Sequence, residues 1–410
     1  MYDICIVGGG ASGLAAAITA AGKNKNIVIL ERGKKAGRKL YATGNGKCNL
    51  TNRKMCPQLF FHSSSPEYET FLNNIMGSQP DEAVISFMSR LGVSTYTNSE
   101  GYVYPASGQA SSVVWAMLDA LRSLHVEIRE QTEVMEIKRI KNGFELMTDH
   151  GIIHAARIIL SCGSSAYASL GGTDSGYTLA ESLGHHIEPV RAALCGLISP
   201  DIPPSLAGIR VPAHAVLKSE MDSVEELQTY GDERGELQIT DYGLSGIMIF
   251  NLSSEAGRLL SQGDRVYIDL DLIENVSRDA FHKLAVGSKH RTCIGMLNGL
   301  IHDKLAAYVT ESLQMERSKR ISELTSKQID AMYNKLRNMR FSISALKGPE
   351  NAQVCAGGVL LSEVDSCSCE SMIVPGLYIT GEMLDIDGIC GGYNLTFALL
   401  SGIRAGKSII

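Results

Sequence analysis

Apolar and polar positions at the start of the chain predict a strand, a helix and a second strand. The apolar run Ile4–Val7 leads into the glycine-rich turn Gly8–Gly13, and segment 14–21 then has the composition of a helix. A second apolar run, Ile27–Leu30, ends in the acidic residue Glu31. Strands joined through a helix in this order form a βαβ unit with parallel strands.

The rest of the pattern divides into a mixed middle and an α/β end. Segment 33–54 is a glycine-rich loop with interleaved apolar residues, which favours a binding loop over a flexible surface loop. Segment 190–270 alternates in short strand-like runs, and 277–338 repeats apolar residues near every 3.6 positions, so we expect a β region followed by helices. Further helices are expected at 66–91, at 112–124, in a segment ending at 183 and from 394, and strands at 126–129, 133–140, 143–148, 151–154, 156–161, within 341–364 and at 376–380. The opening pattern resumes only at the far end, which indicates that the middle is inserted.

Composition and charge narrow the class of protein. The chain of 410 residues is too long for a single compact core, which indicates two or three domains. A net charge of −6 without a dense Lys/Arg run argues against nucleic-acid binding. The chain has no uninterrupted run of ~18 apolar residues, so we expect no membrane span. The ten cysteines show no CxxC pair and no zinc-site spacing, and the early first strand leaves no room for a signal peptide. We therefore expect reduced thiols, no metal and a cytoplasmic protein.

The opening glycines have the spacing of a phosphate cradle. Gly8 allows the tight turn, Gly10 lets the backbone approach a pyrophosphate, and Gly13 lets the helix pack closely on the strand. The helix N-terminus offers unpaired N–H groups to the phosphates. Glu31 is placed to bond ribose hydroxyls, and its charge argues against a 2′-phosphate. The alternative is a glycine-rich turn without a ligand.

The C-terminal segment has the pattern of a second contact region. The run Gly376–Glu382 ends a strand in an acid placed to bond a ribityl or ribose hydroxyl. A helix that begins near Gly392 would point its N–H groups at an electron-rich atom, which in a flavin is the N1–C2=O2 region. The alternative is a closely packed glycine-rich helix cap.

Six sequence blocks carry a family resemblance over nearly the whole chain. They are GGGASG with Glu31, GRKLYATGNGKCNLTN (37–52), GGTDSGYTLAESLGH (171–185), GELQITDYGLSG (235–246), AQVCAGGV (352–359) and GLYITGEMLDIDGICGGYNL (376–395). With these blocks the chain resembles the BaiN/YhiN-type flavoproteins, which are FAD-dependent oxidoreductases of the glutathione-reductase-like superfamily. It departs from the family pattern at Asn45, Lys47 and Cys355.

The resemblance implies an α/β fold with a Rossmann-like FAD-binding domain from both chain ends (1–189 and 356–410). It also implies an inserted β-barrel-like domain (190–275 and 341–355) and a small helical insert (276–340). The residues that it places at FAD are Gly8, Gly10, Ala11, Ser12 and Gly13 at the pyrophosphate, Glu31 at the adenosine ribose, Val134 at adenine, Arg38, Lys39, Thr43, Gly44, Gly46, Lys47, Cys48 and Asn49 along the ribityl chain and ring, and Gly163, Gly381, Glu382, Asp387, Gly392, Asn394 and Leu395 elsewhere along the cofactor, mainly at its flavin end.

The catalytic groups are less marked in the sequence. No second GxGxxG motif with a strand-end acid is present, so NADH or NADPH is expected to visit the flavin rather than occupy its own domain. Possible proton donors are Tyr393, Lys347, His62 and Tyr242, each with a structural role as the alternative. Tyr393 is favoured because it lies at the predicted flavin-facing helix start.

The resemblance implies an NAD(P)H-dependent reductase of activated C=C bonds that acts on a small molecule, a 3-oxo bile acid or steroid-like enone. The alternatives are an amine or aminoketone oxidase that uses O2, and a flavin-containing, RNA-associated binding protein. The net charge argues against the last of these.

Overall fold

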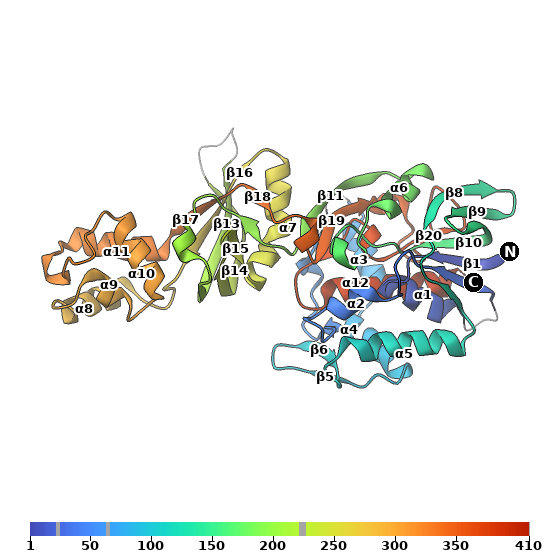
Figure 1. Ribbon diagram of the computed structural model, residues 1–410, viewed down its shortest axis with the longest axis horizontal. Helices are drawn as coiled ribbons and strands as arrows, with labels where there is room; N and C mark the ends of the chain where they lie inside the picture. Colours follow the sequence, from blue (N-terminus) through green and yellow to red (C-terminus); the bar gives the residue numbers. More distant parts are fainter. Residues whose placement is uncertain (22–24, 63–65, 221–226, 410) are drawn as a thin grey trace. The chain divides into compact units, whose positions relative to one another are not determined.

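The computed structural model describes residues 1–21, 25–62, 66–220 and 227–409, and these form two compact units (Figure 1). Unit 1 joins Met1–Ala192 to the chain from Pro349 onward, and unit 2 comprises Ala193–Gly348. Segment 349–355, which was predicted in the inserted β domain, thus falls in unit 1. The helical segment 276–340 falls in the same unit as the inserted sheet.

Unit 1 is built on a mixed sheet with the strand order β7-β2-β1-β10-β9-β8, in which β20 also pairs with β10. Its strands are β1 (Tyr2–Val7), β2 (Ile27–Leu30), β7 (Glu127–Arg129), β8 (Val134–Ile140), β9 (Gly143–Thr148), β10 (Gly151–Leu160) and β20 (Leu377–Ile379). Strands β7, β2, β1, β10 and β20 are parallel, whereas β8 and β9 pair antiparallel. The parallel strands end at one edge, where ligands bind in open α/β sheets.

The two strands expected at 151–154 and 156–161 are one strand, β10. Its first half pairs with β9 and alternates buried and exposed residues, while its second half pairs with β1 and β20 and is buried on both faces. This change from an alternating to a continuous apolar pattern led to the prediction of two separate strands. Physically it marks the point where the strand passes from a half-exposed ribbon into the covered sheet.

Helices cover the sheet of unit 1, and short strands line its loops. The helices are α1 (Ala11–Ala21), α2 (Arg38–Ala42), α3 (Tyr68–Met76), α4 (Pro80–Arg90), α5 (Ala110–Ser123), α6 (Ser175–Ser182) and α12 (Tyr393–Ser408). The short strands are β3 (Thr51–Asn52), β4 (Phe60–Phe61), β5 (Thr95–Thr97), β6 (Tyr102–Pro105), β11 (Ile187–Ala193), β19 (Val354–Val359) and β21 (Asp387–Gly388). The predicted loop 33–54 therefore contains a short helix and a short strand.

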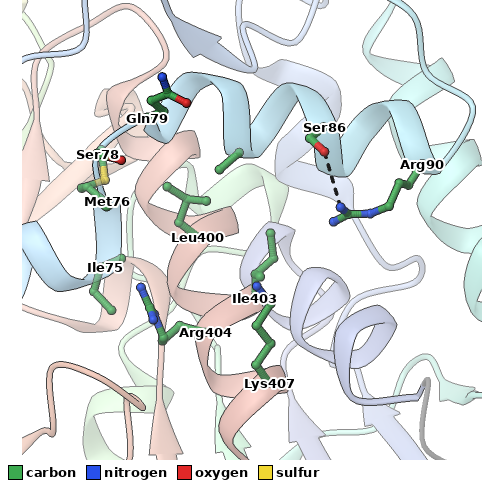
Figure 2. A pocket seen from close by; sticks show the side chains of 12 residues that line it. Ile75, Met76, Ser78, Gln79, Ser86, Arg90, Leu400, Ile403, Arg404 and Lys407 are labelled. Carbon is green, nitrogen blue, oxygen red and sulfur yellow. Dashed lines mark hydrogen bonds between the residues drawn. The ribbon is translucent and has the colours of Figure 1, made fainter.

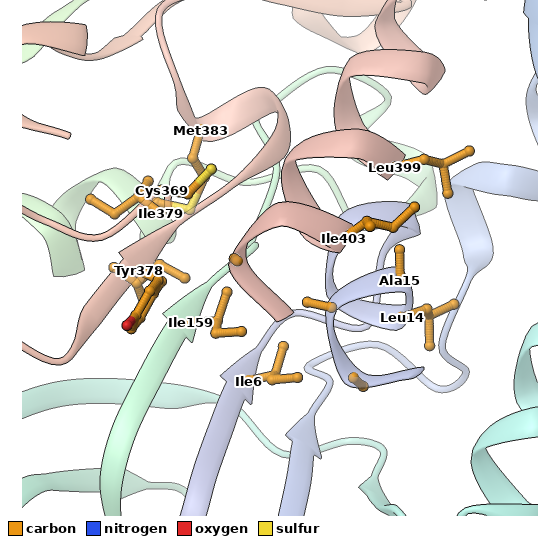
Figure 3. Close-up of a cluster of buried hydrophobic side chains, with 14 of the residues drawn as sticks. Ile6, Leu14, Ala15, Ile159, Cys369, Tyr378, Ile379, Met383, Leu399 and Ile403 are labelled. Atoms are coloured by element: carbon orange, nitrogen blue, oxygen red, sulfur yellow. The ribbon is translucent and has the colours of Figure 1, made fainter. Parts of the chain in front are cut away.

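Two glycines bring the first and last helices of unit 1 into close contact. A Cβ on Gly402 of α12 would lie 2.2 Å from the Ser12 carbonyl oxygen, and one on Gly406 would lie 2.5 Å from that of Ala16. Side chains of α1 and α12, among them Leu14, then pack with the sheet in one apolar core (Figure 3). This contact joins the two chain ends into one unit.

The described residues of unit 2 form an antiparallel sheet and five helices over one apolar core. Its strands, in spatial order, are β17 (Met339–Ile343), β16 (Arg265–Asp271), β13 (Arg210–Glu220), β14 (Gln228–Ile239), β15 (Gly243–Ser245), β12 (Leu197–Ile198) and β18 (Ala345–Leu346). Strands β17 and β18 follow each other in the chain but pair at opposite edges, so segment 339–346 curls the sheet in the manner of a barrel.

The helices of unit 2 are α7 (Ile247–Ser261), α8 (Arg278–Gly287), α9 (Cys293–Leu297), α10 (Asp303–Ser312) and α11 (Ser326–Arg337). The prediction of strand-like runs throughout 190–270 was wrong at α7. Its β-branched and aromatic start resembles a strand, but Ile249, Leu252, Ala256 and Leu259 are buried with the spacing of one helix face.

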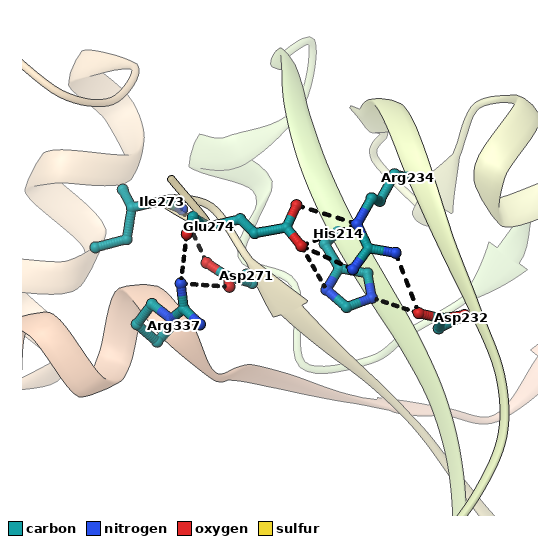
Figure 4. A network of polar contacts seen from close by, with 7 residues as sticks. All are labelled: His214, Asp232, Arg234, Asp271, Ile273, Glu274 and Arg337. Atoms are coloured by element: carbon teal, nitrogen blue, oxygen red, sulfur yellow. Dashed lines mark hydrogen bonds and ion pairs between the residues drawn. The ribbon is translucent and has the colours of Figure 1, made fainter. Parts of the chain in front are cut away.

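An ion-pair network holds the end of α11 against the sheet of unit 2 (Figure 4). Arg337 donates to the Glu274 carbonyl oxygen at 2.8 Å and pairs with Asp271 at 3.1 Å. The Glu274 carboxylate in turn pairs with Arg234 at 2.7 Å. In the parts of the chain that the structure describes, no helix has both the length and the apolar character to cross a bilayer, and no cluster of potential metal ligands occurs.

Candidate cofactor site

The glycine turn between β1 and α1 contains two kinds of glycine. A Cβ on Gly13 would lie 2.1 Å from the Gly8 carbonyl oxygen, and a Cβ on Gly8 would lie 2.5 Å from that of Ser161. Both positions therefore require glycine for packing. Gly10 differs, because no atom lies within 4 Å of the position of its missing Cβ. The space left there is what a cofactor phosphate needs to reach the backbone, so the cradle fits a dinucleotide.

Other predicted residues of the cradle act through the backbone. The Ser12 hydroxyl is buried and lies 2.6 Å from the hydroxyl of Thr380. Ala11 opens helix α1, so its amide is among those that the helix leaves unpaired. Gly381, after β20, has a φ of 68° and donates its N–H to the Ser401 hydroxyl at 2.9 Å. These contacts position the turn rather than supply side chains to it.

The strand-end acid Glu31 lies in a pocket beside the glycine turn. Its carboxylate accepts hydrogen bonds from the backbone N–H of Gly9 at 2.8 Å and of Gly33 at 2.5 Å. The residues lining the pocket are Val7, Gly8, Leu30, Glu31, Arg32, Thr132, Glu133, Val134, Cys162, Gly171, Thr173, Ser175 and Leu179. The structure thus brings the predicted residues Gly8, Glu31 and Val134 together.

Several residues of this pocket were missed in the sequence. Cys162 follows β10, and Thr173 precedes α6. The signal for Cys162 was available, because β10 runs parallel to β1 and both strands end at the same edge. Burial raises the pKa of the Cys162 thiol to about 12, so it stays protonated at neutral pH. Among the predicted residues nearby, Gly163 adopts a φ of 73° and its missing Cβ also faces open space.

A second cluster forms around Glu382, at the end of β20. One carboxylate oxygen pairs with the Lys39 ammonium at 3.0 Å. The other accepts from the Ser164 hydroxyl at 2.6 Å and from the backbone N–H of Cys355 at 3.1 Å. The structure therefore brings together Lys39 and Glu382, two predicted residues far apart in the chain. Arg38 points instead to the loop after β10, where it donates to the Ser169 carbonyl oxygen at 3.2 Å.

The glycine-rich loop after α2 has an unusual backbone. Gly44, Asn45 and Gly46 all have positive φ, at 57°, 54° and 82°. The Thr43 hydroxyl donates to the Leu40 carbonyl oxygen at 2.7 Å. Asparagine tolerates the left-handed conformation better than most residues, which accounts for Asn45 at this position.

The other side chains of this loop divide between the interior and the surface. Cys48 is fully buried, and burial raises the pKa of its thiol to about 11. Asn49 is buried as well, whereas Lys47 is exposed. Cys48 and Asn49 thus hold the loop in place from the inside, and any contact that they make with a cofactor is through their backbone.

The start of α12 is formed by paired glycines, as the sequence indicated. Gly391 and Gly392 have φ values of 114° and 94°, and a Cβ on Gly392 would lie 2.8 Å from the Thr51 backbone. The Asn394 side chain clamps the preceding turn, accepting from the Gly388 N–H at 2.8 Å and donating to its carbonyl oxygen at 2.7 Å. The Asn394 side chain is thus structural, and the helix offers the amides of its first turn.

Two further predicted residues of this end are mostly covered by protein. Asp387, in β21, is only 2% exposed. Leu395 is half-buried in the first turn of α12. Both shape the loop that leads into the helix.

Tyr393 is not placed to act as a proton donor, which corrects the prediction for it. The residue is 2% exposed and packs against the Phe60 ring with centroids 5.3 Å apart. Its hydroxyl donates to the Lys54 carbonyl oxygen at 3.0 Å, and burial raises its pKa to about 12. The start of α12 offers its backbone amides, while this side chain packs in the apolar core.

The other suggested donors have structural partners too. His62 stacks on Tyr68 with ring centroids 3.9 Å apart, and burial lowers its pKa. Lys347 and Tyr242 lie together in unit 2, with the ammonium 4.4 Å from the ring centroid.

The parallel sheet, the glycine turn, the acid after the second strand and the glycine-opened last helix define a class of protein. They are the parts of a dinucleotide-binding oxidoreductase in which FAD supplies two-electron transfer. The chain belongs to the family described as HI0933-like protein Rossmann domain, whose model matches residues 2–408. It is therefore an FAD-dependent oxidoreductase, as the sequence blocks implied.

Comparison with characterised proteins identifies full-length relatives. A 3-dehydro-bile acid delta(4,6)-reductase of Clostridium scindens is 36% identical over 415 residues, covering 100% of this chain and 99% of that protein. A ribosomal RNA dihydrouridine synthase of Escherichia coli is 26% identical, covering 100% of this chain and 98% of its own length. The protein of that name from Haemophilus influenzae is 25% identical, covering 98% and 97%.

Proposed function

We propose that this protein reduces a carbon–carbon double bond conjugated to a carbonyl group, with NADH or NADPH as the electron donor. The preferred substrate is a small molecule, a 3-oxo bile acid or a related steroid enone. The observation that carries this proposal is the 36% identity, over the full length of both chains, to a protein named for such a reaction.

The relatives that modify RNA support the same bond chemistry. Dihydrouridine is uridine whose C5=C6 bond, conjugated to the C4 carbonyl, has been reduced. A steroid 4-en-3-one and a uracil ring therefore present the same electrophile, a β-carbon activated by a carbonyl. The reaction class is common to the named relatives, while the substrate differs between them.

The chain's own residues would hold and tune the cofactor in this reaction. Bound FAD would supply the hydride. The cradle around Gly10 would bind the pyrophosphate, and Glu31 would bond the adenosine ribose. The N-terminus of α12 would place N–H groups and partial positive charge where negative charge accumulates on reduction. The nicotinamide donor would visit this site, because the sequence carries no second phosphate cradle.

We place the protein in the cytoplasm on the state of its thiols. All ten cysteines lie among the described residues as thiols rather than disulfides, and six of them, among them Cys5 and Cys369, are buried. Free thiols in this number are typical of a reducing compartment.

Reduction of uracil in ribosomal RNA is the second candidate, and one surface feature favours it. Between α3, α4 and α12 lies a groove of unit 1 that carries Arg90, Arg404 and Lys407 (Figure 2). None of the described residues that line it is acidic. Such a groove attracts a phosphate backbone, although the net charge of −6 opposes RNA binding overall.

Anaerobic mixing separates these candidates. We expect NADH or NADPH to bleach the visible absorbance of the FAD-loaded protein. A 3-oxo-4-ene bile acid should then restore the absorbance, and mass spectrometry should show that the bile acid has gained two hydrogens. Failure of both nucleotides to bleach it, or peroxide release with amines in air, overturns the proposal.

Dihydrouridine formed in ribosomal RNA without steroid turnover supports the second candidate. Exchange of Arg90 and Lys407 for Glu should abolish the RNA reaction only.

A further inference from the structure

One tyrosine near the predicted flavin end has a strained backbone. Tyr167 lies in the loop after β10 with φ 54° and ψ 54°, the left-handed region that a residue with a side chain seldom adopts. This strained conformation persists only where the surroundings impose it. Strain of this kind clusters at active sites and ligand clamps.

Backbone contacts fix this conformation. The Tyr167 N–H donates to the Pro349 carbonyl oxygen at 3.2 Å, and its own carbonyl accepts from the N–H of Leu170 at 2.8 Å. A Cβ on Gly172 would lie 2.1 Å from the Ala166 carbonyl oxygen, so the loop folds tightly back on itself. The loop thus fixes the backbone at Tyr167, from which its side chain departs.

The surroundings of Tyr167 come from both predicted flavin-binding segments. Lys39 of α2 and Cys390 of the loop before α12 are the charged or titratable groups that act on the hydroxyl. Lys39 is held by Glu382, which also holds Ser164 three residues before Tyr167. The tyrosine therefore stands at the edge of the Glu382 cluster, between segments that the sequence assigned to the flavin.

The Tyr167 hydroxyl differs from those of Tyr177 and Tyr393, which donate hydrogen bonds to backbone carbonyl oxygens. Tyr177 donates to the Glu382 carbonyl oxygen at 3.0 Å, and Tyr393 donates to that of Lys54 at 3.0 Å. The half-buried Tyr167 has no hydrogen-bond partner for its hydroxyl among the described residues. A half-buried hydroxyl without a protein partner is available to a bound substrate.

We propose that Tyr167 donates the proton that completes reduction of the conjugated double bond, with Lys39 as its positioning partner. This rests on the proposed function. Addition of hydride at the β-carbon leaves an electron pair shared between the α-carbon and the carbonyl oxygen. The O–H bond of Tyr167 then breaks as a C–H bond forms at the α-carbon. The tyrosinate is stabilised by the Lys39 ammonium and regains its proton from water.

The protonation state agrees with this role. Burial raises the pKa of Tyr167, and the nearby Lys39 opposes that rise only in part. The hydroxyl therefore carries its proton at neutral pH. Proton donation is expected to be constant through the neutral range and to fall as pH rises through the raised pKa.

The first test measures the two half-reactions of Tyr167→Phe by rapid mixing. Bleaching by NAD(P)H should match the wild type, whereas reoxidation by the enone should slow by about 100-fold, as expected on loss of a general acid. Tyr96→Phe, which removes the hydroxyl of an exposed tyrosine, is the matched control and should leave both rates unchanged. If the wild type reduces the enone and Tyr167→Phe does so equally fast, the assignment of Tyr167 is wrong. If the wild type itself is inactive on enones, the proposed function fails instead.

A second test needs no turnover. Ultraviolet pH titration of FAD-free wild type minus Tyr167→Phe isolates the ionisation of this tyrosine. We expect Lys39→Met to move that difference to higher pH, because it removes the cation that favours the tyrosinate. An unmoved titration would contradict the pairing of Tyr167 with Lys39.

Discussion

The two ends of the cofactor site are built in different ways. The predicted adenosine end is centred on β1, the glycine turn, α1 and β2, which follow one another in the chain, and Val134, Cys162 and Thr173 complete its pocket. The predicted flavin end gathers α2, the loop after β10 and the start of α12 from distant parts of the chain. A local βαβ unit supplies most of the first end, whereas the second depends wholly on tertiary packing of remote segments.

The glycine turn offers the sharpest comparison within the adenosine end. Gly13→Ala places a Cβ against the Gly8 carbonyl and should destabilise the protein by about 3 kcal/mol, as overpacking does. Gly10→Ala places its Cβ in open space, so the free energy of unfolding of the apoprotein should change by less than about 1 kcal/mol. FAD affinity of this variant should nevertheless fall by about 100-fold. Urea unfolding measures the stability of both variants, and FAD titration measures their affinity. Normal FAD binding by Gly10→Ala would show that the cofactor does not bind at this turn.

Glu31→Gln tests the side-chain contribution at the same end. The carboxylate accepts from two backbone N–H groups and would also bond the ribose, whereas an amide is a weaker acceptor. We expect FAD to bind about 10-fold more weakly, measured by fluorescence titration. An unchanged affinity would reject the ribose role, and unfolding in urea without FAD separates a loss of stability from a loss of contact.

At the flavin end, Asn394→Ala tests whether tertiary contacts set the geometry. The variant loses two hydrogen bonds to Gly388 and should lower the free energy of unfolding by about 1–2 kcal/mol. Asn394→Asp keeps the acceptor for the Gly388 N–H, so its free energy of unfolding should lie between those of the wild type and Asn394→Ala. Stability equal to the wild type would show that the clamp does not hold the turn before α12.

Cys48 should show the smallest effect. Burial raises the pKa of its thiol to about 11, so at pH 8 about one molecule in a thousand carries a thiolate. Alkylation of Cys48 in the folded protein, followed by mass spectrometry of its peptide, should be slow and should accelerate as pH rises toward 11. Cys48→Ala should change turnover by less than about twofold, as expected for a group outside the chemistry. Rapid alkylation at pH 8 with loss of activity would instead assign this thiol a reactive role.

The difference between the two ends also explains what the sequence could predict. Signals for β1, the glycine turn and Glu31 are local, whereas Val134 came from the family resemblance; the structure places Glu31 and Val134 in one pocket. The role given to Tyr393 was wrong because its position at a helix start did not show which way the ring points. Tyr167 was overlooked because its left-handed backbone and its neighbour Lys39 arise only from the tertiary fold.

A crystal structure of the FAD-loaded protein tests the two-ended site most directly. We expect adenosine in the pocket of Glu31 and Val134, the pyrophosphate over Gly10, and the isoalloxazine ring at the start of α12 within reach of Tyr167. A flavin ring bound away from α12, or a phosphate that avoids Gly10, would contradict it.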